Sequence, residues 1–212
     1  MEVRKIFKDQ RALLALVILI IIGVVSTINP KFIGIKNLIT IFQQISVIGI
    51  LTMAMSVLLI GGGIDLSIGN IMALSGVVMA RMIGGGQSVL TATAAGVVVG
   101  VLCGFLNGAI ISKSKAIPLI ISLGTSQIFY GLSLTISGGR ILSFNGAFNA
   151  IGKTKLFGVF PVMLLFLIFM VLLSFVLMNW TKFGRRIVAI GGNEKNAFLS
   201  GINVDRYKIM IY

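Results

Sequence analysis

Residues 61–70 read GGGIDLSIGN, and this stretch interrupts one of the most apolar parts of the chain. Asp65 is the only charged residue between Lys36 and Arg81. Glycine gives access to the positive-φ conformations that end helices. The three glycines at 61–63 therefore predict a turn between two apolar helices, and they leave one carboxylate to be explained.

The composition places the chain in a membrane. Of the 212 residues, 57% are hydrophobic and only 11% are charged, whereas soluble domains carry roughly 25% charged residues. The net charge of +13 reflects the presence of only five acidic residues, and the basic residues lie mainly at the ends of apolar segments. We therefore expect an integral membrane protein that contacts membrane lipid and has no nucleic-acid partner.

The apolar segments define the predicted fold. A helix that crosses a bilayer needs about 20 apolar residues, and six segments approach this length. They predict an all-α, polytopic transmembrane bundle of six spans, and a seventh span starts at about Tyr207. The predicted spans cover residues 12–28, 45–60, 66–83, 88–112, 117–136 and 159–179.

The first span also has the basic residues of a signal peptide before it. Its apolar run is long and no convincing A-x-A cleavage site follows, so we expect a retained helix. With the N-terminus in the cytoplasm, twelve Lys and Arg residues fall inside and six outside. This bias favours that orientation.

Four glycines, Gly96, Gly100, Gly104 and Gly108, repeat at a spacing of four. On a helix they form one smooth stripe along which another backbone can approach closely. The stripe predicts tight packing and says nothing about a substrate.

The sequence offers no catalytic site. It has no histidine and one cysteine, so the usual His/Cys metal sets are missing. Residues 148–154, FNAIGKT, resemble the end of a P-loop, but Ala147 stands where the pattern requires glycine. There is also no plausible nucleophile–base pair. We predict that the chain is not an enzyme and that it binds no metal and no cofactor.

The fifth span carries hydroxyl and aromatic side chains at intervals of three and four, on one helical face. Polar groups inside a membrane mark helix–helix hydrogen bonds or an aqueous path, and both interpretations are open here. A path for a neutral, hydroxyl-rich solute could use them for hydrogen bonds and ring stacking. The candidate path residues are Asp65, Ser67, Asn70, Ser122, Thr125, Ser126, Phe129, Tyr130 and Ser133.

Asp65 has three possible roles. As the N-cap of the third span it would accept from the N–H of Ser67 or Ile68. A proton or cation site would need a charged partner at membrane depth, and none is near in the sequence. A substrate ligand would have to face the path. We expect capping, which is compatible with exposure to the path.

A short helix is predicted in the cytoplasmic loop 181–206. Asn193 would be its N-cap, Glu194 would lie in its first turn and Gly201 would end it. A helix this short is marginal alone, so it needs a surface to pack on, and a cytoplasmic partner would supply one.

Four stretches together resemble the permease subunits of bacterial ABC importers for simple sugars, the group of the ribose, xylose and galactose permeases. They are spread over nearly the whole chain after Asn29. They are NPKFIGIKNLITIFQQISVIGI (29–50), GGIDLSIGNIMALSG (62–76), IPLIISLGTSQIFYGLSLTISGGR (117–140) and TKFGRRIVAIGGNEKNAFLSGINVDRYKIMIY (181–212).

The resemblance implies a multi-pass protein of the bacterial inner membrane that carries a monosaccharide such as ribose. The implied partners are a second permease subunit (homodimer or heterodimer), ABC ATP-binding subunits that use Mg-ATP, and an extracytoplasmic sugar-binding protein. The short helix would be the coupling helix seated in the ATPase. Its implied residues are Gly192, Asn193, Glu194, Ala197, Leu199, Ser200 and Gly201.

The chain ends at Tyr212, about a third short of a typical family member. Residues 1–212 would thus be the N-terminal part of a single transmembrane permease domain, either a fragment or a truncated gene product. Two other classes remain. A secondary transporter needs intramembrane carboxylates, and Asp65 is the only candidate. A membrane anchor would need none of the polar face at 122–133.

Overall fold

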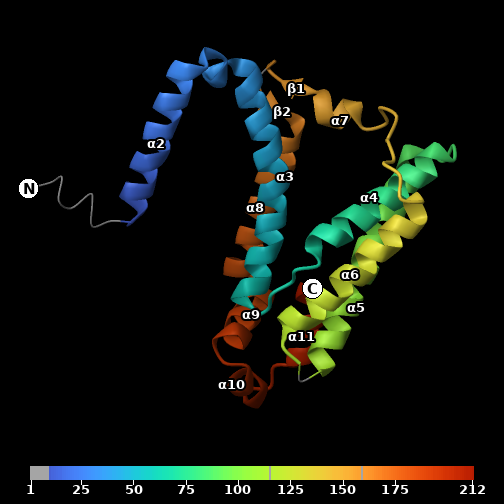
Figure 1. Cartoon of the computed structure of the whole chain (residues 1–212). Coiled ribbons are helices and arrows are strands. Elements are labelled where there is room, and N and C mark those ends of the chain that lie inside the picture. Colours follow the sequence, from blue (N-terminus) through green and yellow to red (C-terminus); the bar gives the residue numbers. More distant parts are fainter. Residues whose placement is uncertain (1–9, 115, 159) are drawn as a thin grey trace, which may run out of the picture.

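The computed structural model describes residues 10–114, 116–158 and 160–212, and helices dominate it (Figure 1). The long helices are α2 (Gln10–Ile28), α3 (Ile35–Ile60), α4 (Ile68–Gly84), α5 (Val89–Lys113), α6 (Pro118–Ser137) and α8 (Val162–Trp180). The short elements are η1 (Pro30–Ile33), α7 (Asn149–Lys153), β1 (Lys155–Leu156), β2 (Phe160–Pro161), α9 (Lys182–Gly192), α10 (Glu194–Leu199) and α11 (Val204–Ile211).

The helical class is confirmed for the described residues, apart from one very short hairpin. In this part of the chain, α3, α5, α6 and α8 are long and apolar enough to cross a membrane, and the apolar helices at Ala12–Ile28 and Ile68–Gly84 are shorter. Most helix limits lie within three residues of the predicted spans.

The start of α3 is a correction. The helix begins at Ile35, and the predicted limit at residue 45 marks only the start of its apolar run. Its first turns are polar but fully helical, because Thr40 donates to the Lys36 carbonyl and Gln43 donates to the Gly152 carbonyl. A prediction based on apolar runs does not include these polar helical turns.

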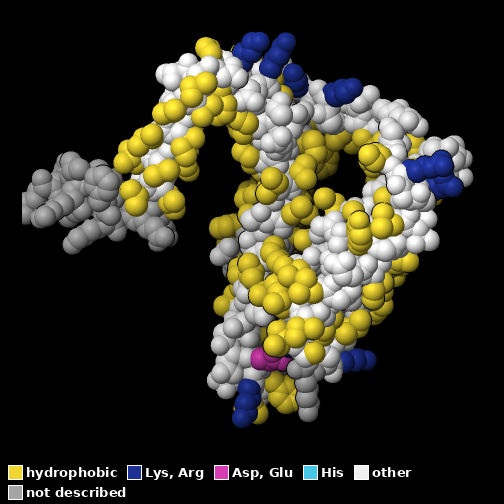
Figure 2. Space-filling view, in the orientation of Figure 1, with side chains coloured by type: hydrophobic (Ala, Val, Ile, Leu, Met, Phe, Trp, Pro, Cys, Tyr) yellow, Lys and Arg dark blue, Asp and Glu magenta, His cyan; other side chains and the backbone are white. Residues whose placement is uncertain are grey.

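Apart from α2, which stands to one side, the long helices form two groups that lie side by side in Figure 1. In one group α3 packs against α8, and in the other α4 packs against α5 and α6 while α11 packs against α5. The core of the second group contains Leu74, Cys103 and Phe129, one residue from each long helix. Figure 2 shows apolar side chains over much of the outer surface, which suits a bilayer.

The predicted glycine stripe on α5 is confirmed as a packing surface. A Cβ on Gly108 would lie 2.8 Å from the Ile209 Cα, and one on Gly104 would collide with the Tyr212 carbonyl. Nearer the start of α5, a Cβ on Gly96 would collide with the Met79 side chain of α4. The stripe therefore seats two different helices.

Candidate functional site

Asp65 lies at the centre of a buried hydrogen-bond network. Its Oδ1 accepts from the backbone N–H of Ser67 (2.7 Å) and from the Ser67 hydroxyl (2.6 Å). The amide nitrogen of Asn107, on α5, lies 3.3 Å from Asp65 Oδ2 and 2.7 Å from Ser67 Oγ. Asp65 is 5% exposed and the other two residues are fully buried. The network therefore ties the turn before α4 to the middle of α5.

The predicted capping role of Asp65 needs a correction in its register. The structure contains the predicted bond to the Ser67 N–H, but α4 begins at Ile68 and its N-cap residue is Ser67. The helix starts late because the Leu66 N–H donates to the Ser122 hydroxyl on α6 at 3.2 Å. Asp65 thus closes an Asx-type turn that leads into the helix.

Within the described residues, the partners of Asp65 are neutral. The ion pair found there joins Lys208 to Glu194 at 2.7 Å, away from Asp65. Neutral donors satisfy the Asp65 carboxylate by hydrogen bonding. The geometry is therefore that of a hydrogen-bonded contact between α5 and the turn before α4, and it is not that of an ion pair.

The polar face of α6 is used largely for packing against α4. Ser126 accepts from the Asn70 amide at 2.8 Å, and its hydroxyl lies 3.4 Å from the Leu66 carbonyl. Ser122 holds the Leu66 N–H, and Ser133 bonds within α6. The buried residues of this face are Ser122, Ser126, Phe129 and Ser133.

Two members of the predicted set flank that buried line. Thr125 is half-buried and its hydroxyl bonds only to carbonyls of its own helix among the described residues. Tyr130 is 49% exposed. These two side chains remain available on either side of the packed face.

As an isolated amide in an apolar span, Asn107 predicts a helix–helix hydrogen bond, but the sequence does not identify Asp65 as its partner. It lies 42 positions from Asp65, and no local pattern links them. The available signal was an amide inside a charge-free span, because such a group usually has a specific partner. Asn107 Oδ1 has no hydrogen-bond partner within the described residues.

The loop after α8 contains one helix more than predicted. The amphipathic α9 buries Gly184, Ile187 and Ile190, and its N-cap Thr181 accepts from the Gly184 N–H. The spacing of the buried residues at every third position was a readable helical signal. We missed it because the neighbouring residues are basic.

The short helix α10 follows the prediction closely. Asn193 is its N-cap and accepts from the Asn196 N–H at 2.9 Å, Glu194 is in its first turn, and Gly201 has a left-handed φ of 79°. Ser200 bonds back to the Asn196 carbonyl. The prediction of this local structure is confirmed.

α10 is seated on its neighbours and exposes two apolar side chains. Ala197 is buried with Ile190 of α9 and Val204 of α11. Phe198 and Leu199 are 67% and 72% exposed. Phe198 was missed in the sequence, although an aromatic residue in a polar loop marks a candidate contact surface.

The ends of α9 and α11 contact the turn that carries Asp65. A Cβ on Gly191 would collide with the Ile60 carbonyl. The Tyr212 hydroxyl donates to the Ile64 carbonyl at 3.2 Å. A Cβ on Gly61 would lie 2.7 Å from Ile211 Cδ1. The glycines therefore let this turn lie directly against both short helices.

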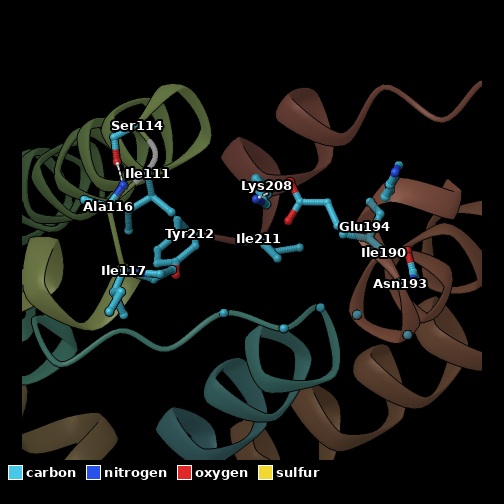
Figure 3. Close-up of a pocket in the computed structure, with 17 residues that line it drawn as sticks. Ile111, Ser114, Ala116, Ile117, Ile190, Asn193, Glu194, Lys208, Ile211 and Tyr212 are labelled. Atoms are coloured by element: carbon cyan, nitrogen blue, oxygen red, sulfur yellow. Dashed lines mark hydrogen bonds and ion pairs between the residues drawn. The ribbon is translucent and has the colours of Figure 1, made fainter. Parts of the chain in front are cut away.

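A pocket of about 770 Å³ opens where these elements meet. Figure 3 shows Glu194 and Lys208 together on one side of it and Tyr212 near Ile117 on the other. Its floor includes the turn at Gly61–Gly63. A smaller cavity of about 130 Å³ borders Asp65, and residues of α3, α4, α5 and α11 line it.

Within the described residues, no group of three or more His, Cys, Asp or Glu side chains could hold a metal ion. The site thus offers hydrogen-bonding and packing surfaces. Chemically, its hydroxyl, amide and carboxylate groups can form hydrogen bonds with polar groups.

Comparisons with known proteins place these features in context. Residues 37–212 match the family described as branched-chain amino acid transport system / permease component. The ribose import permease protein RbsC of Bacillus subtilis is 39% identical over 202 residues, which are 94% of this chain and 62% of that protein. The same-named protein of Escherichia coli K12 is 35% identical over 214 residues, 96% of this chain and 64% of that protein.

A ribose import permease of Haemophilus influenzae is 32% identical over 217 residues, 100% of this chain and 66% of that protein. The chain thus spans less than two thirds of the length of these relatives. No solved structure was found to match it. The relatives confirm the resemblance to sugar import permeases, and the match over residues 37–212 shows that this chain belongs to the family of branched-chain amino acid transport system permease components.

Proposed function

We propose that this chain is part of the membrane-spanning permease subunit of an ATP-driven importer for a monosaccharide such as ribose. The ribose permeases similar to it support the substrate class. The chain itself would carry out no covalent chemistry and bind no cofactor, and Mg-ATP would be hydrolysed by a separate ATPase subunit. A second permease subunit and an extracytoplasmic sugar-binding protein would complete the transporter.

The chain would cross the bacterial inner membrane six times and begin a seventh span in α11. The N-terminus and the elements α9 and α10 would face the cytoplasm. The excess of Lys and Arg on that side supports this orientation. The shorter apolar helices α2 and α4 would span with the help of their flanking residues.

The observation that carries the proposal is the way α10 is presented. Its buried side rests on α9 and α11, and its other side exposes Phe198 and Leu199. An exposed apolar pair on a short, well-seated helix suits insertion into a groove of a partner protein. We assign that groove to the ATPase subunit.

Movement of α10 would reach the membrane core through packed contacts. The Glu194–Lys208 ion pair ties α10 to α11, and Arg186 of α9 bonds to Tyr207 of α11. Because Gly191 and Tyr212 contact the turn at 60–64, a shift of this unit would displace Asp65 and its network. This is a coupling route of contiguous contacts.

The substrate path would run beside the packed face of α6. Tyr130 and Thr125 would contact the sugar, since Tyr130 is exposed and the half-buried Thr125 bonds only within its own helix among the described residues. The walls of the path would be held in place by the other members of the predicted set, which are Asp65, Ser67, Asn70, Ser122, Ser126, Phe129 and Ser133. Ring stacking by Tyr130 suits a sugar, which has one apolar face.

A secondary transporter is the alternative that the sequence leaves open. It requires a carboxylate that exchanges a coupling ion. The neutral partners of Asp65 within the described residues support the ATP-driven mechanism instead.

The proposal is tested by co-purification with the ATPase subunit encoded beside this chain. The wild-type chain is expected to retain the ATPase, and Phe198→Asp combined with Leu199→Asp is expected to release it. Ile141→Asp is the matched control, because Ile141 is fully exposed in the connection after α6. Retention of the ATPase by the α10 variant would sink the docking assignment.

A further inference from the structure

The place where α8 meets α9 carries an exposed tryptophan and two exposed basic side chains. We call Trp180, Lys182 and Arg185 the junction patch. Trp180 is the last residue of α8 and is 71% exposed. Lys182 and Arg185 are exposed at the start of α9. The substrate path, the docking surface of α10 and the coupling route proposed above use none of these three residues.

The positive charge of the junction patch is not neutralised within the described residues. The sequence has no acidic residue between Asp65 and Glu194, so α8 and α9 contain none. The ion pair found in the described part of the chain joins Glu194 to Lys208. Lys182 and Arg185 are three residues apart and therefore neighbours on the helix, where like charges repel each other. A bound anion would remove this repulsion.

The patch is held in a fixed direction by the other side of α9. The Arg186 guanidinium donates to the Tyr207 hydroxyl of α11 and lies 5.5 Å from the centre of the Tyr207 ring. The rings of Phe183 and Tyr207 also pack together, with their centres 5.8 Å apart. These contacts fix the rotation of α9 about its axis. Lys182 and Arg185 are therefore kept on its exposed side.

An exposed apolar stripe of α8 leads to the junction patch. None of the residues Val162–Trp180, all of which the structure describes, is buried. Intervals of three and four place four exposed residues on one side of the helix, and they are Phe169, Leu172, Val176 and Trp180. From Phe169 to Trp180 the helix rises about 16 Å, close to half of the roughly 30 Å thickness of the hydrocarbon core. The stripe therefore has the length of one lipid leaflet.

Trp180 marks the level of the lipid headgroups. Tryptophan is enriched at the membrane–water interface, because one part of its ring system is apolar and the other is polar. The Trp180 ring packs edge-on against the Phe175 ring, with centres 5.8 Å apart, so it is supported at the end of the stripe. Lys182 and Arg185 follow directly in the chain, where the phosphate groups of lipids lie.

We propose that the junction patch binds the phosphodiester headgroup of an anionic phospholipid such as phosphatidylglycerol, with an acyl chain lying on the apolar stripe of α8. Lys182 supplies a point charge, and Arg185 can donate two parallel hydrogen bonds to the phosphate oxygens. This inference goes beyond the proposed function and holds whichever solute the chain carries. In the orientation proposed above, the lipid belongs to the cytoplasmic leaflet.

An anionic lipid fits the junction patch better than the ATPase subunit does. The patch is continuous with the apolar stripe of α8, which suits acyl chains, and a soluble subunit cannot reach a stripe inside the bilayer. The helix α10, which we assign to the ATPase, is separated from α8 by the whole of α9 (Figure 1). The patch is also compact, since its members lie between residues 180 and 185, and a compact basic cluster suits one headgroup.

The test uses Trp180 as its probe. It is the only tryptophan of the chain, so tryptophan fluorescence reports on this patch alone. The full chain is reconstituted in bilayers of phosphatidylcholine and phosphatidylglycerol, one of which carries bromine on its acyl chains as a quencher. Comparison of the two brominated lipids gives their relative binding constant at the patch. The wild type is expected to prefer phosphatidylglycerol by about fivefold or more, and about 300 mM NaCl should weaken this preference.

Removal of the two charges separates this patch from the rest of the surface. Lys182→Gln with Arg185→Gln should bring the relative binding constant to about one. Both side chains are exposed, so the unfolding midpoint should not change. Lys153→Gln with Lys155→Gln is the matched control, because these residues lie at the other end of the bundle, in α7 and β1 (Figure 1). The control should keep the preference of the wild type.

Four outcomes would overturn the inference. They are a wild type without lipid preference, a Lys182→Gln and Arg185→Gln variant that keeps it, and a preference abolished by inorganic phosphate at constant ionic strength, which would make this a site for soluble anions. The fourth is release of the ATPase by the same variant with its lipid preference unchanged, which would assign the patch to the ATPase. None of these outcomes contradicts the proposed function, which is tested separately by the α10 variant.

Discussion

The Asn107 amide nitrogen lies 3.3 Å from Asp65 Oδ2, and so α5 is bonded to the turn between α3 and α4. The same nitrogen lies 2.7 Å from Ser67 Oγ. A lone carboxylate in an apolar region thus has a structural use. It joins two helices at the point where α9 and α11 also touch the turn.

The Asp65–Asn107 contact gives a charge-swap prediction. Asn107→Asp places two carboxylates together and should lower the free energy of unfolding by roughly 3 kcal/mol. Asp65→Asn alone should lower assembly more than it changes substrate preference. The double variant Asp65→Asn with Asn107→Asp restores one charge and one amide, so it should recover most of the loss. Thermal unfolding of the purified chain compares the stability of the three variants, and co-purification with the ATPase and sugar uptake measure the assembly and substrate preference of Asp65→Asn. A double variant as unstable as Asn107→Asp would refute the contact.

The glycine stripe of α5 predicts a graded response to alanine. Gly108→Ala pushes a methyl group against Ile209 of α11 and should cost about 1–3 kcal/mol. At Gly100 the nearest atom is the Ser75 hydroxyl, 3.5 Å from an added Cβ. Gly100→Ala should therefore be neutral or stabilise by about 0.5 kcal/mol. Equal unfolding temperatures for the two variants would contradict close packing at α11.

Gly191 should control coupling. An added methyl group meets the Ile60 carbonyl, whereas one at the neighbouring Gly192 meets nothing within 4 Å. Gly191→Ala should retain the ATPase yet reduce sugar-stimulated ATP hydrolysis by about tenfold. A steric misfit that costs about 1.4 kcal/mol is enough for a tenfold change. Gly76→Ala in α4 is the control, because an added methyl group there meets nothing within 4 Å, and it should behave as wild type. If the two variants stimulate hydrolysis equally, the route through residues 60–64 is wrong.

Tyr130 and Ser126 should separate binding from packing. Tyr130→Ala removes a half-exposed ring and should reduce sugar uptake without lowering the unfolding temperature. Ser126→Ala removes the partner of the Asn70 amide and should destabilise by about 1–3 kcal/mol. Uptake assays and thermal unfolding on the same preparations distinguish these outcomes. A Tyr130→Ala variant that transports normally would remove this residue from the path.

The sequence predicted the parts of the fold that depend on continuous apolar runs. α5 and α6 lie within one residue of their predicted limits, because length and hydropathy alone specify a membrane helix. The start of α3 was missed because helical backbone can continue through polar turns. The helix α9 was not predicted, because its buried face is made of only three residues, which lie among basic residues and glycines.

The candidate site was only partly predictable. Local capping rules specified Asn193 as the N-cap of α10. The polar face of α6 was visible as a pattern, but the pattern could not tell a path from a helix contact. The bonds of Ser122 and Ser126 to the α4 region required the three-dimensional arrangement. The pairing of Asp65 with Asn107 also required the three-dimensional arrangement, because the whole of α4 lies between these two residues in the sequence.

The most direct measurement of the central claim is the release of labelled ribose from inside-out membrane vesicles that contain this chain, its ATPase and, in the lumen, its binding protein. ATP added outside reaches the α9–α11 side, and the sugar starts in the lumen. The account predicts that ribose leaves the lumen only with ATP, and that Gly191→Ala strongly reduces this export while Gly76→Ala does not. Export that follows an ion gradient without ATP would contradict the account.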